Sequence, residues 1–319
     1  MCSSDLPQAR HPVLFYYWFE KSISKILKQI NADIFISPDG YLSLRTETKS
    51  IPVMHDINFM HNPKDFPFGI RNYYQYFFPR FAKKAERIVT VSDFSKNDIS
   101  EQFAINQENI DVVYNGSKEI YEPSSENEKL ITKNKYSQGK DYFLFVGALS
   151  PRKNVANLLS AFDIFKEKTK SNFKLVIVGE KMFKTKNIKT VFSNMKHKRD
   201  IVFVGRMNPE ELSKIYGSAY ALTFVPYFEG FGIPIIEAMN CETAVITSNV
   251  TSMPEVAGDA ALLVDPFSTE VIANAMIQIQ QEPELRTQLI KKGKIQCKKF
   301  RWDNTAEKFW ESIEKVLYE

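Results

Sequence analysis

The segment Glu229-Gly-Phe-Gly-Ile-Pro-Ile-Ile-Glu237 follows an apolar run at residues 220–226 and leads into a helix-forming stretch. The apolar run is long enough for a buried strand, and the residues around Glu237 favour a helix. A helix that begins after the glycines points its unpaired N–H groups and its positive dipole end at whatever lies beyond the strand. The segment therefore predicts a diphosphate site formed by Gly230, Phe231, Gly232 and Ile233.

A carboxylate stands on each side of this glycine loop. We expect Glu229 on the loop, near the phosphates or an attached sugar. Glu237 is expected within the helix, where its oxygens accept hydrogen bonds from ribose or sugar hydroxyls. The alternative is that both are ordinary surface acids, which is the commoner outcome for an isolated pair at this spacing.

Further segments occur in an order and spacing known from one family. They are residues 145–154 (FVGALSPRKN), 175–179 (LVIVG), 202–205 (VFVG) and 252–261 (SMPEVAGDAA). Together with residues 229–237 they resemble the retaining glycosyltransferases of family 4, and the resemblance covers nearly the whole chain. It implies an α/β fold of the GT-B type, in which two Rossmann-like doubly wound domains face a cleft, the first of them incomplete here.

The activity implied by this resemblance is a group transfer. A sugar would pass from a nucleotide diphosphate sugar to an acceptor hydroxyl with retention at the anomeric carbon, in the synthesis of a cell-surface polysaccharide or glycolipid. The acceptor would be a saccharide or a lipid-linked saccharide. The sequence leaves the base, the sugar and the acceptor open.

Apolar runs alternate with helical patterns in two parts of the chain, which is typical of parallel βαβ construction. We expect a partial acceptor-side domain at residues 1–125, a polar linker at 126–140 and a nucleotide-sugar-binding domain at 141–300. A closing helix at 301–319 is expected to pack back on the first domain. The family's glycine-rich first βα unit is absent, so we expect the protein to begin upstream of Met1.

Two cations follow the first strand of the second domain. Arg152 and Lys153 come shortly after Gly147, at a carboxyl end where a departing diphosphate needs charge neutralisation. Family members commonly carry an arginine directly after the glycine, but Ala148 stands there, so Arg152 is expected to substitute for it. The alternative is a solvated turn.

His55 ends the apolar run at residues 51–54. The resemblance places such a histidine near the transferred sugar, where its ring or backbone contacts a hydroxyl. A histidine in this position is otherwise a structural hydrogen-bonding residue. We therefore expect His55, Arg152, Lys153 and Glu229 to be the catalytic residues.

The composition of the chain limits the class of protein to which it can belong. The chain has 319 residues, 44% of them hydrophobic and 25% charged, as ordinary soluble proteins have. A net charge of +4 is too small to indicate nucleic acid binding. The three cysteines show no regular spacing, and the sequence contains no long apolar run and no basic region followed by an apolar stretch, so we expect neither a membrane-spanning segment nor secretion. We expect a cytoplasmic protein with reduced thiols.

No Asp-x-Asp pair and no H-E-x-x-H arrangement is present, so we expect no metal and no cofactor; the nucleotide sugar is a substrate. Two other interpretations stay open, a sugar-nucleotide epimerase and a catalytically silent nucleotide-binding protein. The aromatic residues between Tyr73 and Phe81, beside Arg80, predict either a core helix or a peripheral contact with the inner face of a membrane. A core helix is the commoner outcome.

Overall fold

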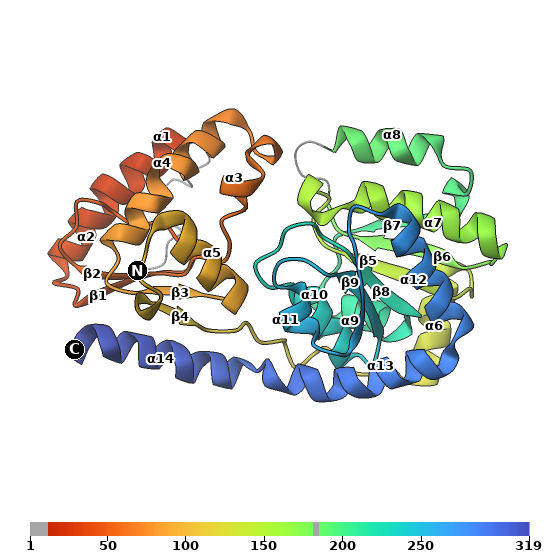
Figure 1. Cartoon of the computed structure of the whole chain (residues 1–319). Helices are drawn as coiled ribbons and strands as arrows, with labels where there is room; N and C mark the ends of the chain where they lie inside the picture. Colours follow the sequence, from red (N-terminus) through yellow and green to blue (C-terminus); the bar gives the residue numbers. More distant parts are fainter. Residues whose placement is uncertain (1–11, 181–184, 319) are drawn as a thin grey trace. The chain divides into compact units, whose positions relative to one another are not determined.

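The computed structural model describes residues 12–180 and 185–318 (Figure 1). The expectation about the residues around Met1 lies outside them. The chain divides into two compact units. The first contains residues 1–114 and 306–319, and the second contains residues 115–305.

The first unit is built on short parallel strands. β1 (Ile34–Ser37) pairs with β2 (Lys49–Pro52), and β3 (Ile88–Thr90) pairs with β4 (Ile110–Val112). A parallel bridge between Val53 and Val89 connects the two pairs. The helices are α1 (Pro12–Tyr17), the π-helix η2 (Trp18–Ile23), α2 (Ser24–Gln29), α3 (Asn58–His61), α4 (Phe68–Lys84) and α5 (Asp93–Phe103), and most of α14 (Trp302–Tyr318) belongs here too.

The aromatic residues of α4 form much of the core of this unit. Tyr73, Phe78 and Phe81 are buried, and Phe78 packs edge-on against Phe59 of α3 with ring centroids 5.1 Å apart. The expectation of a core helix is therefore confirmed. Tyr76 is the exception, since it is 53% exposed and lies under the guanidinium of Arg80.

The last helix, α14, completes the first unit. Ile313 and Val316 pack with Ile51, Val89 and Val113 in one buried cluster. Because these contacts join the end of the chain to three strands or their extensions, the final turns of α14 are part of the core of the first unit.

The second unit contains a parallel sheet of six strands in the order β10-β9-β8-β5-β6-β7. Its strands are β5 (Tyr142–Val146), β6 (Lys174–Val178), β7 (Ile201–Gly205), β8 (Ala221–Phe224), β9 (Ala244–Ser248) and β10 (Ala261–Val264). β5 and β8 are neighbours although two strands separate them in sequence, so the strand order reverses between them. In open α/β sheets, ligands bind beyond the carboxyl ends of the strands at such a switch point.

Helices cover both faces of this sheet (Figure 1). α7 packs against α8 and α12, whereas α10 packs against α9, α11 and α13. Their bounds are α7 (Val155–Thr169), α8 (Lys186–Asn194), α9 (Pro209–Ser218), α10 (Ile233–Asn240), α11 (Met253–Ala257), α12 (Thr269–Gln281) and α13 (Pro283–Gln296).

The stretch expected as a linker contains a helix, α6 (Glu126–Ser137). The Ser125 side chain accepts from the backbone N–H of Glu128, whose carboxylate accepts in turn from the backbone of Ser125. This capping box satisfies backbone groups at the start of the helix. α6 packs on α9, and the second unit begins at Asn115 rather than at residue 141.

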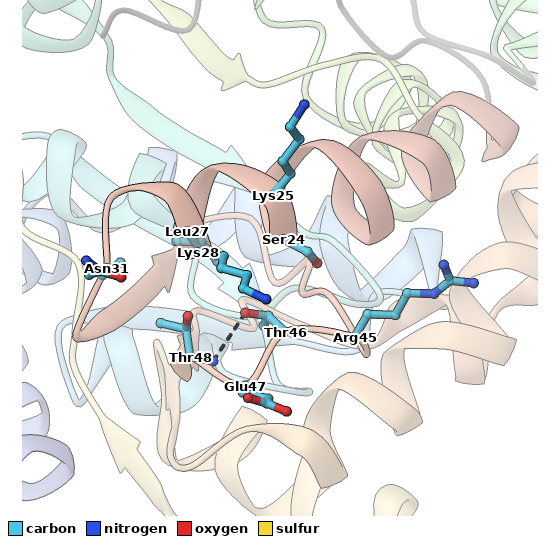
Figure 2. Close-up of a pocket in the computed structure, with 10 residues that line it drawn as sticks. Ser24, Lys25, Leu27, Lys28, Asn31, Arg45, Thr46, Glu47 and Thr48 are labelled. Carbon is cyan, nitrogen blue, oxygen red and sulfur yellow. Dashed lines mark hydrogen bonds between the residues drawn. The ribbon is translucent and has the colours of Figure 1, made fainter.

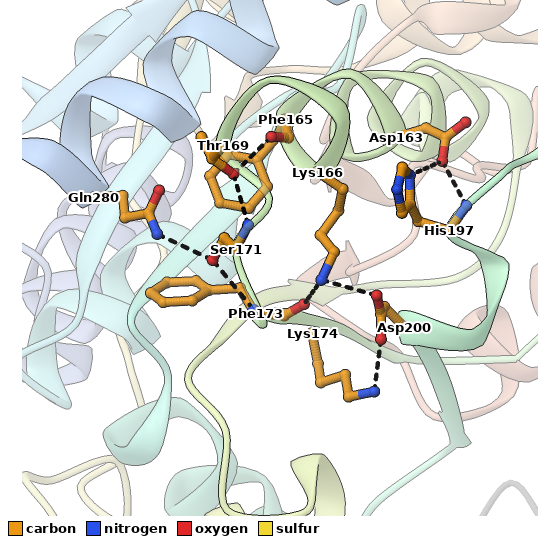
Figure 3. A network of polar contacts seen from close by, with 10 residues as sticks. All are labelled: Asp163, Phe165, Lys166, Thr169, Ser171, Phe173, Lys174, His197, Asp200 and Gln280. Carbon is orange, nitrogen blue, oxygen red and sulfur yellow. Dashed lines mark hydrogen bonds and ion pairs between the residues drawn. The ribbon is translucent and has the colours of Figure 1, made fainter.

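A buried lysine fixes one edge of the second unit (Figure 3). The Lys166 ammonium, on α7, donates to the carbonyl of Phe173 at 3.1 Å and pairs with Asp200 at 2.8 Å. Lys174 pairs with the other oxygen of Asp200 at 2.6 Å. Burial acts to raise the pKa of Asp200, but the two ammonium groups outweigh it and lower the pKa. The network joins α7, β6 and the turn before β7.

Across residues 12–180 and 185–318, every helix is too short or too polar to cross a membrane.

Candidate functional site

Arg152, Lys153 and Glu229 come together at the switch point of the sheet. Nη1 of Arg152 lies 2.7 Å from Oε1 of Glu229, and Lys153 pairs with the other carboxylate oxygen. The cations stand in the short turn after β5, and Glu229 stands in the loop after β8. The structure thus brings together three of the four expected catalytic residues.

This cluster is largely withdrawn from solvent. Glu229 is 9% exposed, and the side chain of Lys153 is 13% exposed. Burial acts to raise the pKa of Glu229, but the charges and hydrogen bonds of Lys153 and Arg152 outweigh it, so the pKa is lowered. Glu229 is therefore ionised at neutral pH. The cluster holds two positive charges and one negative charge.

Backbone contacts tie the two loops together. The Arg152 guanidinium donates to the carbonyl of Phe228 at 3.3 Å, and the Arg152 backbone carbonyl accepts from the N–H of Tyr227 at 3.1 Å. The Ser252 hydroxyl donates to the Glu229 carbonyl at 2.8 Å. The positions of Arg152 and Glu229 are thus fixed by main-chain contacts as well as by their charges.

The glycine loop leads into α10 as expected. Gly232 precedes the first residue of the helix with φ of +93°, a conformation that favours glycine. A Cβ atom there would also lie 2.6 Å from Cε of Met253. Pro234 occupies the first turn, where a missing N–H costs no helical hydrogen bond. The remaining first-turn N–H groups form a positive helix end next to the Glu229 loop.

Glu237 lies apart from the ion-pair cluster, in contact with tyrosines. The Tyr216 hydroxyl, from α9, donates to Oε2 of Glu237 at 2.8 Å. Burial raises the pKa of Glu237, and the hydrogen bonds from Tyr216 and Tyr121 oppose that rise only in part. Sequence reasoning named Glu237 but missed both tyrosines, since nothing in the local pattern pairs residues this far apart.

The loops at the carboxyl ends of β5 and β6 approach each other closely at Gly147 and Gly179. The Gly147 N–H donates to the carbonyl of Val178 at 3.0 Å. Gly179 then passes so close that a Cβ atom on it would lie 2.0 Å from the Gly147 carbonyl oxygen. This close approach explains why position 179 is a glycine, whereas Gly147 has a φ of +149°, a conformation that favours glycine.

A cavity of about 440 Å³ opens beside these loops. Its apolar lining comes from Leu149, Ile188, Phe192 and Phe203, and the charged residues Glu180 and Lys189 also line it. Because the cavity follows β5, β6 and β7, it lies on the same edge of the sheet as Arg152 and Lys153. Sequence reasoning did not assign Phe192 or Phe203 to a site.

His55 belongs to the first unit. It is exposed at the carboxyl end of β2, and Nε2 lies 2.9 Å from the carbonyl of Pro38, just after β1. Its own carbonyl accepts from the Ser95 hydroxyl at 3.1 Å. His55 thus lies at the carboxyl ends of its own strands, and its catalytic role stays a prediction.

Asn154 is a structural residue that sequence reasoning quoted without a role. Its side-chain amide donates to the carbonyls of Val225 at 3.0 Å and Pro266 at 2.7 Å. These bonds join the turn that carries Arg152 and Lys153 to the loops after β8 and β10. Among residues 12–180 and 185–318, no three His, Cys, Asp or Glu side chains are grouped to hold a metal ion.

Comparison with known proteins agrees with this fold. The family model described as Glycosyl transferases group 1 matches residues 126–296, and the Glycosyltransferase Family 4 model matches residues 3–117. The structure of WaaG, described as a glycosyltransferase involved in lipopolysaccharide biosynthesis, aligns with a TM-score of 0.76 at 17% identity, covering 98% of this chain and 85% of that one. Sucrose-phosphate synthase from Thermosynechococcus elongatus aligns with a TM-score of 0.79 at 16% identity, covering 98% and 80%.

The fold and the site therefore define a glycosyltransferase of the GT-B type, and the expected fold class is confirmed. The chain belongs to the glycosyl transferases group 1 family. It is 31% identical over 272 residues to O-antigen chain mannosyltransferase B of Escherichia coli, covering 85% of this chain and 71% of the relative. It is 28% identical over 286 residues to the O-antigen chain mannosyltransferase RfbU of Salmonella typhimurium, covering 88% and 74%.

Proposed function

We propose that this glycosyltransferase moves a mannosyl unit from a nucleoside diphosphate mannose to a hydroxyl of a saccharide acceptor. The transfer retains the configuration at the anomeric carbon, needs no metal ion and serves the synthesis of a cell-surface polysaccharide. The observation that carries the proposal is the contact of Glu229 with Arg152 and Lys153 across the switch point. The names of the mannosyltransferase relatives support the choice of sugar.

The charges of the site suit a departing diphosphate. Arg152 and Lys153 exceed Glu229 by one positive charge, and the N-terminal end of α10 adds a positive partial charge. As the bond to the sugar breaks, negative charge grows on the diphosphate. Well-placed donors stabilise such charge by about 3 kcal/mol each.

Glu229 positions the donor sugar. Its carboxylate is held from both sides by cations, so it stays ionised and accepts hydrogen bonds from sugar hydroxyls. It is not assigned as a nucleophile. Retention follows from the family resemblance, in which the acceptor attacks on the donor's own face.

The 440 Å³ cavity suits the base of the donor. Leu149, Phe192 and Phe203 provide apolar surface for a flat ring. Guanine presents two N–H donors on one edge, and a carboxylate accepts two parallel N–H bonds. Glu180 therefore favours guanine over uracil, whose single ring N–H lies between two carbonyls.

Glu237 is proposed to bind the ribose of the donor. A carboxylate has about four lone-pair sites, so the hydroxyls of Tyr216 and Tyr121 leave acceptor capacity for a diol. The two tyrosines hold Glu237 in one orientation. Glu237→Ala should abolish nucleotide binding while Tyr216→Phe weakens it.

We propose that the reaction occurs in the cytoplasm, where thiols stay reduced. Cys241 and Cys297 are both free and buried. The acceptor is a saccharide, free or lipid-linked, and peripheral membrane contact is proposed only for the lipid-linked case.

The test is product analysis with GDP-mannose, UDP-glucose and their free diphosphates. GDP-mannose and a mannosylated acceptor oligosaccharide should give GDP and an α-linked product by NMR. Calorimetry should show GDP binding that Glu237→Ala removes. Conversion of the donor to an isomeric nucleotide sugar would identify an epimerase, and binding without turnover would identify a silent nucleotide-binding protein.

A further inference from the structure

A second cavity in the second unit, of about 500 Å³, takes no part in the steps above. Its lining includes Lys118, Tyr121, Lys298, Phe300, Arg301 and Trp302. These residues come from two segments, one at the start of the unit and one after α13. A backbone hydrogen bond from the N–H of Ser117 to the carbonyl of Phe300, 3.3 Å long, joins the segments.

The lining of this cavity combines positive charge with aromatic surface. In the part of the chain that the structure describes, neither Lys118 nor Lys298 has an ion pair. Arg301 lies 3.5 Å from Asp303, which lines the cavity together with Glu119. Three cations therefore face two acids, and the surplus is positive.

Aromatic rings form the rest of its recognition surface. Phe300 is 4% exposed, whereas Trp302 is 47% exposed and accessible to a ligand. Rings and cations in one cavity suit an anion with a flat apolar body. We propose that this cavity binds a small aromatic anion bearing a phosphate or carboxylate group, and that its occupant influences the donor site.

Two residues of the lining touch the donor site. The ring of Phe300 packs edge-on against Phe231 of the glycine loop, with centroids 5.5 Å apart. Tyr121 donates to Glu237 and packs edge-on against Tyr216, with centroids 5.7 Å apart. The cavity thus has one contact to the diphosphate loop and another to the proposed ribose-binding carboxylate.

A ligand packed on Phe300 and Tyr121 restrains both contacts. It reduces the ordering that the glycine loop and Glu237 undergo when a nucleotide binds, so the two ligands strengthen each other's binding. This coupling rests on the proposed function. The binding of a ligand in the cavity does not depend on the proposed function.

Calorimetric titration with 1-naphthyl phosphate tests occupation of the cavity, with the donor site filled by GDP. Saturable binding is expected, and Lys298→Gln should weaken it about tenfold. Lys299→Gln is the matched control, because Lys299 is the exposed neighbouring lysine and does not line the cavity. No binding, or equal loss in the two variants, overturns the site. Inorganic phosphate should bind more weakly, and equal affinity overturns the aromatic requirement.

The coupling is measured as GDP affinity with and without the probe. An increase of about fivefold is expected, and Phe300→Leu should remove it. Unchanged GDP affinity in the wild type overturns the coupling. If GDP itself fails to bind, the proposed function fails, and titration of the probe alone still decides whether the cavity is a binding site.

Discussion

Nη1 of Arg152 lies 2.7 Å from Oε1 of Glu229, which joins the loop after β5 to the loop after β8. These are the strands between which the order of the sheet reverses. The contact therefore has two effects. It holds together the two loops at the switch point of the sheet, and it helps to set the net charge that a bound diphosphate would meet there.

Glu229→Gln should lower both stability and turnover. The substitution removes the carboxylate charge that Arg152 and the poorly exposed Lys153 both contact. Breaking a buried ion pair in this way typically costs about 3 kcal/mol. Urea unfolding at pH 7 measures the loss, and steady-state kinetics measures the fall in kcat.

The matched control for that experiment is Asp259→Asn. Asp259 pairs with Lys292 at 2.9 Å on the surface, where both side chains are exposed. Its loss should change the melting temperature little. Equal effects of the two substitutions would contradict the special role of Glu229.

The stability of the protein should depend on pH through Glu229. Its pKa in the folded state is below its ordinary value of 4.5, so the unfolded chain binds the proton more tightly. The stabilisation is present above pH 4.5 and is lost as the pH falls through the folded-state pKa. Urea unfolding between pH 7 and pH 3 should show the wild type and Glu229→Gln converging at low pH. A difference in free energy of unfolding that stays constant from pH 7 to pH 3 would contradict the lowered pKa of Glu229.

Gly232→Ala should destabilise the protein and weaken nucleotide binding. The new Cβ would meet Met253 at 2.6 Å, and the positive φ of +93° adds roughly 1–2 kcal/mol for a residue other than glycine. Gly205→Ala is the control, because Gly205 has φ of +72° with nothing within 4 Å of its Cβ position. Gly205→Ala should lose only the stability that the positive φ costs a residue other than glycine. Thermal unfolding of the two variants separates the clash from the backbone strain.

Glu180→Gln should reduce the affinity for GDP about tenfold, a loss of about 1.4 kcal/mol, and narrow the preference for GDP over UDP. An amide has one acceptor oxygen where a carboxylate has two, so it cannot accept both parallel N–H bonds that guanine offers. Glu242→Gln is the control, since Glu242 pairs with Lys294 outside the cavity. Calorimetry with GDP and UDP gives two affinities for each of the wild type and the two variants. A preference for UDP in the wild type would show that the base was assigned wrongly.

Sequence patterns predicted the local parts of the site better than its contacts. The strand, the glycine loop and α10 were predicted around Gly232, because apolar runs and glycines act over a few residues. The partners of Glu229 and Glu237 were not predicted. They depend on which strands become neighbours, and a single sequence does not contain that information directly.

The helix α6 was missed although its signal was present. Ser125 and Glu128 have the spacing of a capping box, but the surrounding prolines, serines and charges indicated a linker. The short helix α3 was also unexpected. Its start follows Asp56, whose carboxylate accepts from the Asn58 N–H at 3.0 Å.

The place of α14 has a consequence for the order of folding during synthesis. Ile313 and Val316 fill a core whose other walls are Ile51, Val89 and Val113, and the Lys49 ammonium donates to the Val316 carbonyl at 2.6 Å. A ribosome therefore makes all of the second unit before the first can close its core. Until then Ile51, Val89 and Val113 lack two of the side chains that bury them, and exposed apolar surface of this kind makes a folding intermediate prone to aggregation.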